Sequence, residues 1–530
     1  MSPNLKKYLW IPVVGIVAAL YWRTLYFGFV WDDPTLTLKI LPNYQHLIDV
    51  FMPLRMSDMP LNYYRPLAFF SWMIDRTFWG TNPFGYHATE IMLHAVNVVL
   101  VYFLTKRLLA RYESAHWGAL AAALIFAVHP VQTEAVCWIS CRPEILFTAF
   151  VFGSFLSFIH FRDTQEHKWL ILSLVCWFLG LLTKETAVAL LPCLIVYDIF
   201  FTAEKRKALR CYAWHPVVFL VYLLLRQQYL YSSGGHFEFG GVFGILPQLL
   251  KRLLSAYDFY VQRALFPYSL SGFVPELAQS KAFIFGVLII GIWAYWKKNR
   301  LLLYFILFFL ITLLPSSLIA ITNVSQTPVA ERYLYLPMYA VSFLAGLAVA
   351  AIPGGRYIKL LKYALLLAVL ILLGYKTVLR IPVWQNDLTF FQTASMQNPN
   401  HGIPYQLLGN AYHEINDYPH AIEYYHKAIS APLFNKVGII STYNNLGKIY
   451  TILKRYDKAE EYFQKALKKK DASDIYYYLG YLYLEMAENS KKGRKELLKK
   501  AISSLEECLK RSPDDKDGQV LLTKARSLLR

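Results

Sequence analysis

The chain has 530 residues, of which 56% are hydrophobic and 16% are aromatic, and its mean hydropathy is +0.33. This composition is too apolar for an ordinary soluble protein and predicts a membrane protein with more than one domain. The formal net charge of +19 could indicate a nucleic-acid-binding protein, but the basic residues before residue 383 lie in short runs between apolar stretches. Such runs are typical of cytoplasmic loops, so we predict a lipid bilayer as partner and no nucleic acid.

About eleven apolar stretches approach the length of about 20 residues that a helix needs to cross a bilayer. They lie near residues 9–29, 86–108, 115–130, 143–161, 168–182, 186–202, 212–230, 281–296, 301–320, 333–352 and 361–379. We therefore predict an all-α, polytopic membrane domain over residues 1–383. An odd number of spans places the two ends of the chain on opposite sides of the membrane.

Basic clusters orient these spans. Those that fall on one face are Lys6 and Lys7, Lys106 with Arg107 and Arg111, Arg162 with Lys168, Lys205 to Lys207 with Arg210, Lys297 with Lys298 and Arg300, and Arg356 with Lys359 and Lys362. Positive charge collects on the cytoplasmic side. Residues 30–85, residues 231–280 and everything after residue 380 are therefore expected on the opposite side.

This orientation holds only if the segment 246–266 does not cross the membrane. The segment carries Lys251, Arg252, Asp258 and Arg263. Charges at this density predict an amphipathic helix lying on the outer surface.

After residue 384 the long apolar runs stop and a helical repeat begins. Aromatic and small residues recur at the same internal spacing in three copies, near 402–435, 440–473 and 473–515, the third with an insertion between its helices. They are Tyr405, Leu408, Gly409, Tyr412, Ala421, Tyr425 and Ala428; Tyr443, Leu446, Gly447, Tyr450, Ala459, Phe463 and Ala466; and Tyr476, Leu479, Gly480, Tyr483, Ala501, Leu505 and Cys508. This spacing matches the tetratricopeptide pattern of about 34 residues and predicts an α-solenoid over residues 384–530.

Two adjacent carboxylates, Asp32 and Asp33, follow the first predicted span. Charge close to a membrane is costly unless it is solvated or used. A carboxylate there could remove a proton from an acceptor hydroxyl while a sugar on a lipid phosphate is presented from the bilayer. The structural alternative is a helix-ending Asp-Asp-Pro turn.

Other polar motifs lie in the expected outer loops. They are Tyr64-Arg65-Pro66-Leu67, the run from Asn82 to His87, the run from His129 to Val136 with Arg142-Pro143-Glu144, Thr183-Lys184-Glu185, and the run from Glu331 to Pro337. With these segments the chain resembles the transmembrane and tetratricopeptide-repeat-containing O-mannosyltransferases and their bacterial relatives. The resemblance covers nearly the whole chain, including the order of membrane part and repeats.

The resemblance implies a glycosyltransferase of the C superfamily, with an acidic motif in a long first outer loop and a polyprenyl-phosphate sugar donor. Asp32 and Asp33 fall on that motif, with Asp32 expected as the base and Asp33 as a helper. Side by side, two carboxylates raise one another's pKa. The implied reaction transfers a sugar, expected to be mannose, to Ser or Thr hydroxyls of an acceptor protein with inversion.

A phosphate leaving group needs cations where its charge develops. Arg332, Arg65 and Arg142 are the candidates, because a guanidinium can form paired hydrogen bonds with a phosphate. The alternatives are an interfacial anchor for Arg332 and ordinary pairing with carboxylates for Arg65 and Arg142.

The second-loop residues His129 and Glu134 belong to the same family motif and are expected to contribute to donor binding. Gln132 stands where many relatives have a His, so we predict no metal site and no cofactor, although a divalent metal is not excluded. Lys184 and Glu185 are expected to pair with each other.

The repeats are expected to bind an extended peptide or an acceptor protein on their inner surface. The predicted contact residues are Asn410, His413, Asn444, Lys448 and Tyr477. The alternative is that the repeats only hold the protein in a complex.

Two other functions stay open at this point. One is a non-enzymatic membrane anchor for a repeat scaffold, and the other is a glycan enzyme resembling O-antigen ligases or polymerases. A ligase-like enzyme is expected to have its largest outer loop late in the membrane part, whereas here the first loop is the longest. We expect a bacterial inner membrane with periplasmic repeats, or the endoplasmic reticulum membrane with luminal repeats in a eukaryote.

Overall fold

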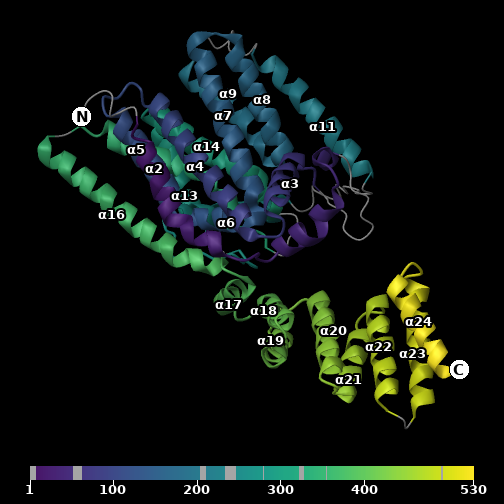
Figure 1. The fold of residues 1–530 in the computed structure, drawn as a ribbon. Coiled ribbons are helices and arrows are strands. Elements are labelled where there is room, and N and C mark those ends of the chain that lie inside the picture. Colours follow the sequence, from purple (N-terminus) through teal and green to yellow (C-terminus); the bar gives the residue numbers. More distant parts are fainter. Residues whose placement is uncertain are drawn as a thin grey trace. The chain divides into compact units, whose positions relative to one another are not determined.

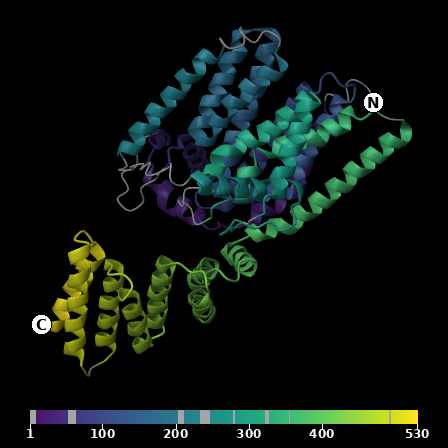
Figure 2. The same ribbon diagram turned by 180° about the vertical axis from the view of Figure 1, so that it is seen from behind.

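The computed structural model describes residues 8–51, 63–202, 211–232, 246–277, 280–320, 327–353, 355–490 and 493–530. This part of the chain is helical and contains no β-strand beyond one isolated bridge between His401 and Leu433. It divides into two compact units, Met1–Asn386 and Asp387–Arg530, which can be followed by colour along the chain (Figure 1, Figure 2). The predicted all-α fold, with apolar helices first and tetratricopeptide repeats after them, is confirmed.

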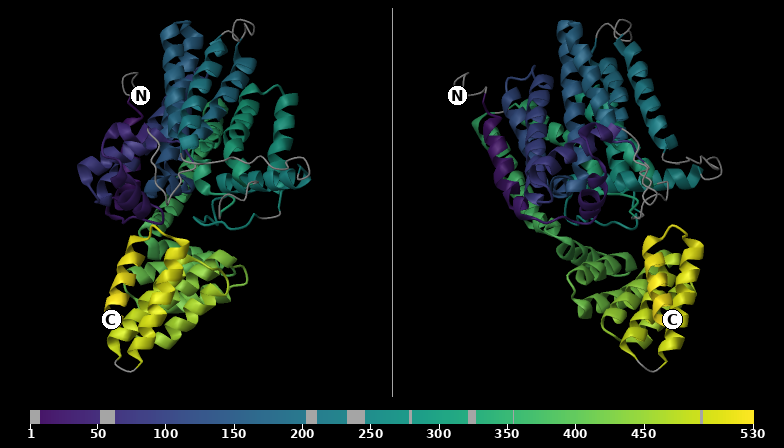
Figure 3. Two further views of the ribbon diagram at one scale, coloured as in Figure 1. Left: turned by 90° about the vertical axis from the view of Figure 1, so that its right-hand side faces the viewer. Right: turned by 45° about the vertical axis from the view of Figure 1, so that its right-hand side comes forward.

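The first unit is a bundle of apolar helices. They are α2 (Ile11–Tyr21), α3 (Pro66–Trp79), α4 (Pro83–Leu108), α5 (Ala115–Val128), α6 (Thr133–Cys137), α7 (Arg142–Thr164), α8 (His167–Thr183), α9 (Leu190–Phe201), α11 (Trp214–Ser232), α12 (Leu246–Leu265), α13 (Ala282–Trp296), α14 (Arg300–Ser317), α15 (Met338–Ala351) and α16 (Arg356–Arg380). Every predicted apolar stretch falls on one of them. Helices α7 and α8 pack side by side over their lengths (Figure 3).

Four helical segments of the described chain combine the length and the apolarity of a membrane span: Pro83–Leu108, Ile139–Thr164, Arg300–Ser317 and Arg356–Trp384. A fifth candidate, Ala115–Val128 with Pro130–Cys137, is bent by 50° at its break. Shorter apolar helices are Ile11–Tyr26, His167–Thr183, Ala282–Trp296 and Met338–Ala351. The chain is thus a multi-pass membrane protein, while the number of eleven spans stays a prediction.

Helix α16 illustrates how this unit fits a bilayer. Only 17% of its most apolar window is buried, and Leu361 is 70% exposed. The side chains that face the bundle are Leu373, Thr377 and Arg380. An apolar stripe of this length would be unfavourable in water, whereas lipid tails cover it without cost.

Close helix packing in the first unit depends on small residues. A Cβ atom added to Gly118 on α5 would lie 2.7 Å from the Gly346 carbonyl oxygen on α15. Small residues at such a crossing let two backbones approach, which is a common way for helices to associate in membranes.

Helix α12 lies in the segment expected to rest on the outer surface. It is not among the segments of the described chain that are apolar enough to span. Its Asp258 is buried and accepts hydrogen bonds from the backbone N–H groups of Phe283 (2.7 Å) and Ile284 (3.0 Å). Asp258 therefore satisfies the first N–H groups of α13 from a neighbouring helix.

The second unit consists of antiparallel helix pairs. Its helices are α17 (Asp387–Gln397), α18 (Gly402–Glu414), α19 (Tyr418–Ser430), α20 (Lys436–Ile452), α21 (Tyr456–Leu467), α22 (Ser473–Asn489), α23 (Arg494–Arg511) and α24 (Lys516–Leu529). A Cβ on Gly409 would lie 2.6 Å from the Tyr425 ring, and one on Gly447 would lie 2.5 Å from the Phe463 ring. The glycines of the repeat pattern therefore sit where an aromatic ring of the second helix contacts the first.

Candidate functional site

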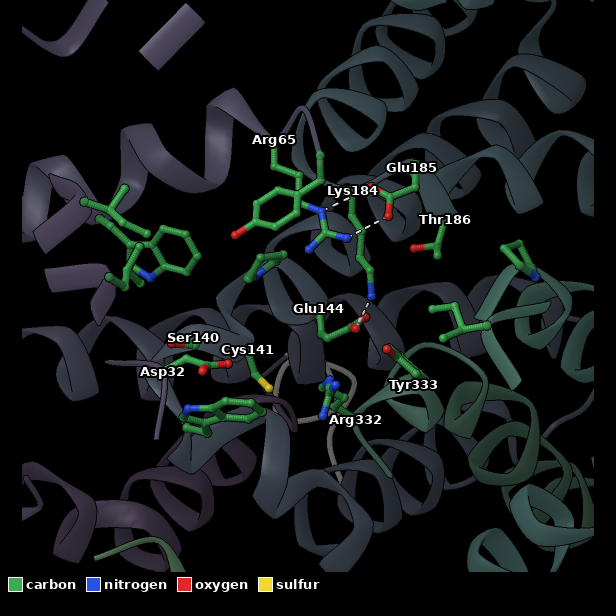
Figure 4. Close-up of a pocket in the computed structure, with 18 of the residues that line it drawn as sticks. Asp32, Arg65, Ser140, Cys141, Glu144, Lys184, Glu185, Thr186, Arg332 and Tyr333 are labelled. Atoms are coloured by element: carbon green, nitrogen blue, oxygen red, sulfur yellow. Dashed lines mark hydrogen bonds and ion pairs between the residues drawn. The ribbon is translucent and has the colours of Figure 1, made fainter. Parts of the chain in front are cut away.

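A cavity of about 770 Å³ opens in the first unit. Its lining includes one aspartate, two glutamates and four cations: Asp32, Glu144, Glu185, Arg65, Lys184, Arg226 and Arg332. In Figure 4, Asp32 lies with Ser140 and Cys141 on one side of the cavity, and the ion pairs of Arg65 and Lys184 lie together on another. The cavity thus brings together residues from the segment between α2 and α4, the segment between α5 and α7, the turn before α9, α11 and the segment before α15.

The loop that carries Asp32 is held by Asp33. The Asp33 side chain is buried and accepts hydrogen bonds from the Val30 N–H (3.1 Å), the Ser140 N–H (2.8 Å) and the Ser140 hydroxyl. Three donors on one carboxylate fix the turn and join it to the second outer loop. The side chain of Asp32 is solvent-accessible and faces the cavity.

Three tryptophans stack behind this turn. Trp31 has a φ of +56°, a left-handed conformation that costs a bulky residue about 1–3 kcal/mol. Its ring lies parallel to that of Trp138 with 5.1 Å between centroids, and Trp138 stacks on Trp384 at 5.7 Å. The Trp138 indole N–H also donates to the Val30 carbonyl (3.1 Å). Stacking therefore offsets the backbone strain that turns Asp32 toward the cavity.

Two ion pairs cover another wall of the cavity. Arg65 donates to both oxygens of Glu185, at 3.1 and 2.6 Å. The Lys184 ammonium donates to Glu144 and lies 4.8 Å from the centroid of the Tyr333 ring. The expectation that Lys184 and Glu185 pair with each other was wrong, because the extended backbone at Lys184 sends adjacent side chains in opposite directions.

Arg332 is held at the edge of the cavity by a second-loop glutamate. Its guanidinium donates to Glu134 Oε1 (2.6 Å) and its backbone N–H donates to Glu134 Oε2 (3.1 Å). The guanidinium also lies over the rings of Trp138 (5.2 Å) and Tyr333 (4.9 Å). Glu134 is fully buried and does not line the cavity, so its contact with the site runs through Arg332.

Like Glu134, two other predicted donor-binding residues, Arg142 and His129, do not line the cavity. Arg142 is fully buried, with ion pairs to Asp75 (2.5 Å) and Glu90 (2.6 Å), which agrees with the pairing alternative. His129 is buried, and its Nδ1 accepts from the Val131 N–H (3.3 Å).

Arg226 is a cavity residue that the sequence analysis missed. It lines the cavity from α11, and no acidic partner for it is found among the residues that the structure describes. A charged side chain inside an apolar helix is a functional candidate by default. That signal was present in the sequence, in an arginine that interrupts the predicted span 212–230.

Desolvation raises the pKa of both carboxyl groups of the acidic pair. Desolvation raises the pKa of Asp32 above its ordinary value, and nearby Arg332 partly opposes this. Desolvation also raises the pKa of Asp33 to about 7, despite the hydrogen bonds from Ser140 and Val30 that lower it. Asp32 itself contributes to that rise by charge repulsion.

A second buried cluster supports the segment that carries Arg332. Glu331 accepts from Arg380 (2.6 Å) and from the Ser271 N–H (2.7 Å), and Arg380 also donates to the Thr133 hydroxyl (2.9 Å). The end of α16, the second outer loop and the segment before α15 therefore share one polar network.

Among the described residues, no group of three or more His, Cys, Asp or Glu side chains is placed to hold a metal ion. Gln132 is fully buried, and neither its amide nitrogen nor its oxygen has a hydrogen-bond partner in the described chain. Its amide therefore takes no part in the polar network around Thr133.

The predicted peptide-binding residues lie on first helices of the repeats. Asn410 accepts from the Tyr425 hydroxyl (2.8 Å) and the Asn445 amide (3.0 Å), and Asn444 donates to Asp474 (3.0 Å). The Lys448 ammonium lies 3.9 Å from the Tyr478 ring centroid. His413 and Tyr477 are half-buried. The two asparagines thus already bond within the repeats.

Fold and cavity define a class: a multi-pass helical membrane protein with an ion-paired polar cavity and a tetratricopeptide-repeat unit. The model of the dolichyl-phosphate-mannose-protein mannosyltransferase family matches residues 66–228, and tetratricopeptide-repeat models match residues 404–432 and 440–470. The first match begins with α3 and includes two of the cavity cations, Lys184 and Arg226.

Curated relatives agree with this class. Human protein O-mannosyl-transferase TMTC3 is 25% identical over 87% of this chain and 55% of its own length. Drosophila melanogaster protein O-mannosyl-transferase Tmtc1 is 34% identical over 34% of this chain and 21% of its own length. A solved structure, that of the APC/C hetero-tetramer Cut9-Hcn1, aligns with 93% of this chain and 98% of its own at 15% identity, with a TM-score of only 0.25.

The chain is thus similar to the TMTC-like O-mannosyltransferases with tetratricopeptide repeats. It spans about half the length of the TMTC3 proteins that it matches.

Proposed function

We propose that this protein is a membrane mannosyltransferase that moves mannose from a polyprenyl-phosphate donor to Ser or Thr hydroxyls of acceptor proteins, with inversion at the anomeric carbon. The observation that carries this proposal is the charge arrangement in the cavity. Asp32 has no ion-pair partner among the residues that the structure describes, whereas Glu144 and Glu185 are each paired. One available carboxylate facing several cations is the arrangement that such a reaction needs.

In the proposed reaction the acceptor hydroxyl attacks the anomeric carbon and gives its proton to Asp32. The new bond joins the anomeric carbon to the acceptor oxygen, and the bond from that carbon to the donor phosphate oxygen breaks. The electron pair leaves with the lipid phosphate. Asp32 acts as the general base, and Asp33 positions it through the turn that Asp33 fixes.

The departing phosphate gains negative charge as the bond breaks. Arg332, Arg65 and Arg226 line the cavity and are proposed to stabilise that charge, with Lys184 beside them. Arg332 and Arg65 are pre-oriented by Glu134 and Glu185. Preorganised cations of this kind need little rearrangement when charge develops. We assign Glu134 a positioning role, and Arg142 and His129 a role in holding the surrounding loops.

The acceptor is proposed to be held by the repeats, and the cavity is proposed to face away from the cytoplasm. Basic residues at the opposite loops support this orientation, and repeat solenoids commonly bind extended peptides.

The test measures transfer of radiolabelled mannose from polyprenyl-phosphate-mannose to protein in membranes that contain equal amounts of each variant. Asp32→Asn keeps the side-chain shape and removes the base, so transfer should fall about 10²- to 10⁴-fold. Asp49→Asn is the matched control, because Asp49 lies between α2 and α3 like Asp32, is half-buried, does not line the cavity and accepts backbone N–H groups of Gln45 and His46.

If the wild type transfers only other sugars from lipid-linked donors, the proposed glycosyltransferase activity stands, but mannose is not the sugar. Full activity of Asp32→Asn would overturn the general base, and absence of any transfer by the wild type would favour a repeat scaffold anchored in the membrane.

A further inference from the structure

A second hollow lies between α4, α7 and α8, away from the cavity that contains Asp32. It has a volume of about 590 Å³, within the range of about 300–1,000 Å³ that is usual for ligand sites. Its lining residues are Phe103, Lys106, Arg107, Ala110, Gly153, Leu156, Ser157, His160, Trp169, Leu172 and Cys176. We propose that this hollow is a binding site for one anionic phospholipid, independent of the proposed transfer reaction.

The hollow has an apolar part and a polar end. Phe103 and Leu172 line the apolar part, and both remain substantially exposed, at 37% and 42%. Gly153 on α7 lies beside Cys176 on α8, and the missing side chain leaves room between the two helices. Helices α4 and α7 lie in two of the segments that are apolar enough to span. An acyl chain therefore fits this surface, because the surface already faces lipid.

The polar end carries the charge that selects the headgroup. Arg107 is paired with Asp163, and Lys168 is paired with Glu166. Lys106 lies in the last turn of α4 and lines the hollow, and no acidic partner for it is found in the described part of the chain. Basic pockets between membrane helices bind anionic lipid headgroups. In this proposal, Lys106 contacts the phosphate group of the phospholipid.

Aromatic contacts close the same end. The Trp169 ring lies 4.4 Å from the His160 ring, and its indole N–H donates to Glu166 (3.0 Å). Tryptophan is enriched where acyl chains meet headgroups. Trp169 therefore marks the depth at which the lipid would change from chain to headgroup.

The test uses the full chain in nanodiscs of phosphatidylcholine alone or of phosphatidylcholine mixed with phosphatidylglycerol, and native mass spectrometry counts the lipids that each protein retains. We expect the wild type to retain phosphatidylglycerol in preference to phosphatidylcholine. Lys106→Gln should weaken this preference about fivefold, the equivalent of about 1 kcal/mol for one cation at a membrane surface.

Gly153→Leu should remove retention of either lipid, because the leucine side chain fills the hollow. Leucine also favours a helix more than glycine does, so the variant is expected to fold. Lys297→Gln is the matched control, since Lys297 is an exposed lysine at the end of α13. Equal retention of both lipids by the wild type would overturn the proposal, and so would an equal loss in Lys297→Gln and Lys106→Gln.

Discussion

Asp32 and Asp33 are neighbours in the chain but lie in different surroundings. Asp33 is enclosed and takes three hydrogen bonds, whereas Asp32 faces the cavity. A carboxylate whose oxygens are already occupied is poorly suited to accept a proton from a substrate. At the scale of single residues, these surroundings favour our proposal that Asp32 takes part in the chemistry and that Asp33 positions it.

The raised pKa of Asp32 gives a pH dependence. Asp32 must be ionised to act as a base, so transfer should rise with pH through a pKa above the ordinary value of about 3.9. Arg332 lowers that pKa, so Arg332→Gln should move the acid limb of the kcat profile to higher pH. Arg65→Gln removes a cation that pairs with Glu185 and should reduce transfer without moving the limb. If the acid limb of the kcat profile stays at the same pH in Arg332→Gln, then Arg332 does not influence the pKa of the catalytic base.

Stability should also depend on Asp33. Its pKa is raised by folding to about 7, so the folded state favours the protonated form. The resulting stabilisation is complete below the unfolded value of about 3.9 and is lost as pH rises through about 7. The unfolding temperature of the wild type should therefore fall over this window by more than that of Asp33→Asn. A thiol-reactive dye can follow unfolding, because Cys137 and Cys193 are buried and free. If the unfolding temperatures of the wild type and of Asp33→Asn change equally with pH, the raised pKa does not belong to Asp33.

The residue patterns predicted which loops carry chemistry, but not which atoms meet. Arg65 and Glu185 are 120 positions apart, and nothing local to either indicates the other. Likewise, the turn that points Asp32 and Asp33 in different directions depends on Trp31 stacking on Trp138, which is more than a hundred residues away in the chain. Asp32, Arg65 and Arg332 were expected at the site and line the cavity. For Arg142, the sequence could not indicate which two buried carboxylates pair with it.

Helices α3, α4 and α7 meet at Arg142. Its partners Asp75 and Glu90 come from α3 and α4, and all three side chains are buried. Removing one partner of a buried ion pair costs about 3–5 kcal/mol because it leaves charge uncompensated. Arg142→Gln should therefore lower the unfolding temperature and the yield of folded protein strongly.

Arg65→Gln is the comparison for that variant, since Arg65 and its partner Glu185 line the cavity and are both partly exposed, so the loss of Arg65 should affect transfer more than folding. If Arg142→Gln folds normally but is inactive, Arg142 has a role in donor binding and not only in holding the helices together.

The helices themselves were predictable because their signals are local. Long apolar runs predicted α4, α7, α14 and α16, and the spacing of the repeat pattern predicted α18 to α23. Helix α3 was not expected as an element of the first outer loop. Its mixed sequence has no long apolar run, and its helical state depends on packing of Phe69 and Trp72 against the turn that contains Leu41 and Tyr44.

At the scale of the whole molecule, the repeats should affect which acceptors are used. The double variant Lys448→Ala, Tyr477→Ala should raise the KM for a protein acceptor several-fold while leaving kcat with a short Ser-containing peptide unchanged. Both residues lie on first helices of the repeats, and neither belongs to the cavity. Lys465→Ala with Lys427→Ala is the control, because these lysines lie on second helices in exposed pairs with Glu461 and Glu423. Equal effects of the two double variants would contradict a specific inner surface.

The tryptophan stack also constrains the order of biosynthesis. The turn with Asp32 emerges from the ribosome early, yet Trp384 and the Gln385 carbonyl, which accepts from the Gly28 N–H (3.0 Å), are made more than three hundred residues later. Until α16 has been inserted, the early turn lacks the partners that offset its strain. A nascent chain stopped within α16 would hold every cavity-lining residue, but not a finished turn. The turn that carries Asp32 is thus expected to be completed only when α16 is in place.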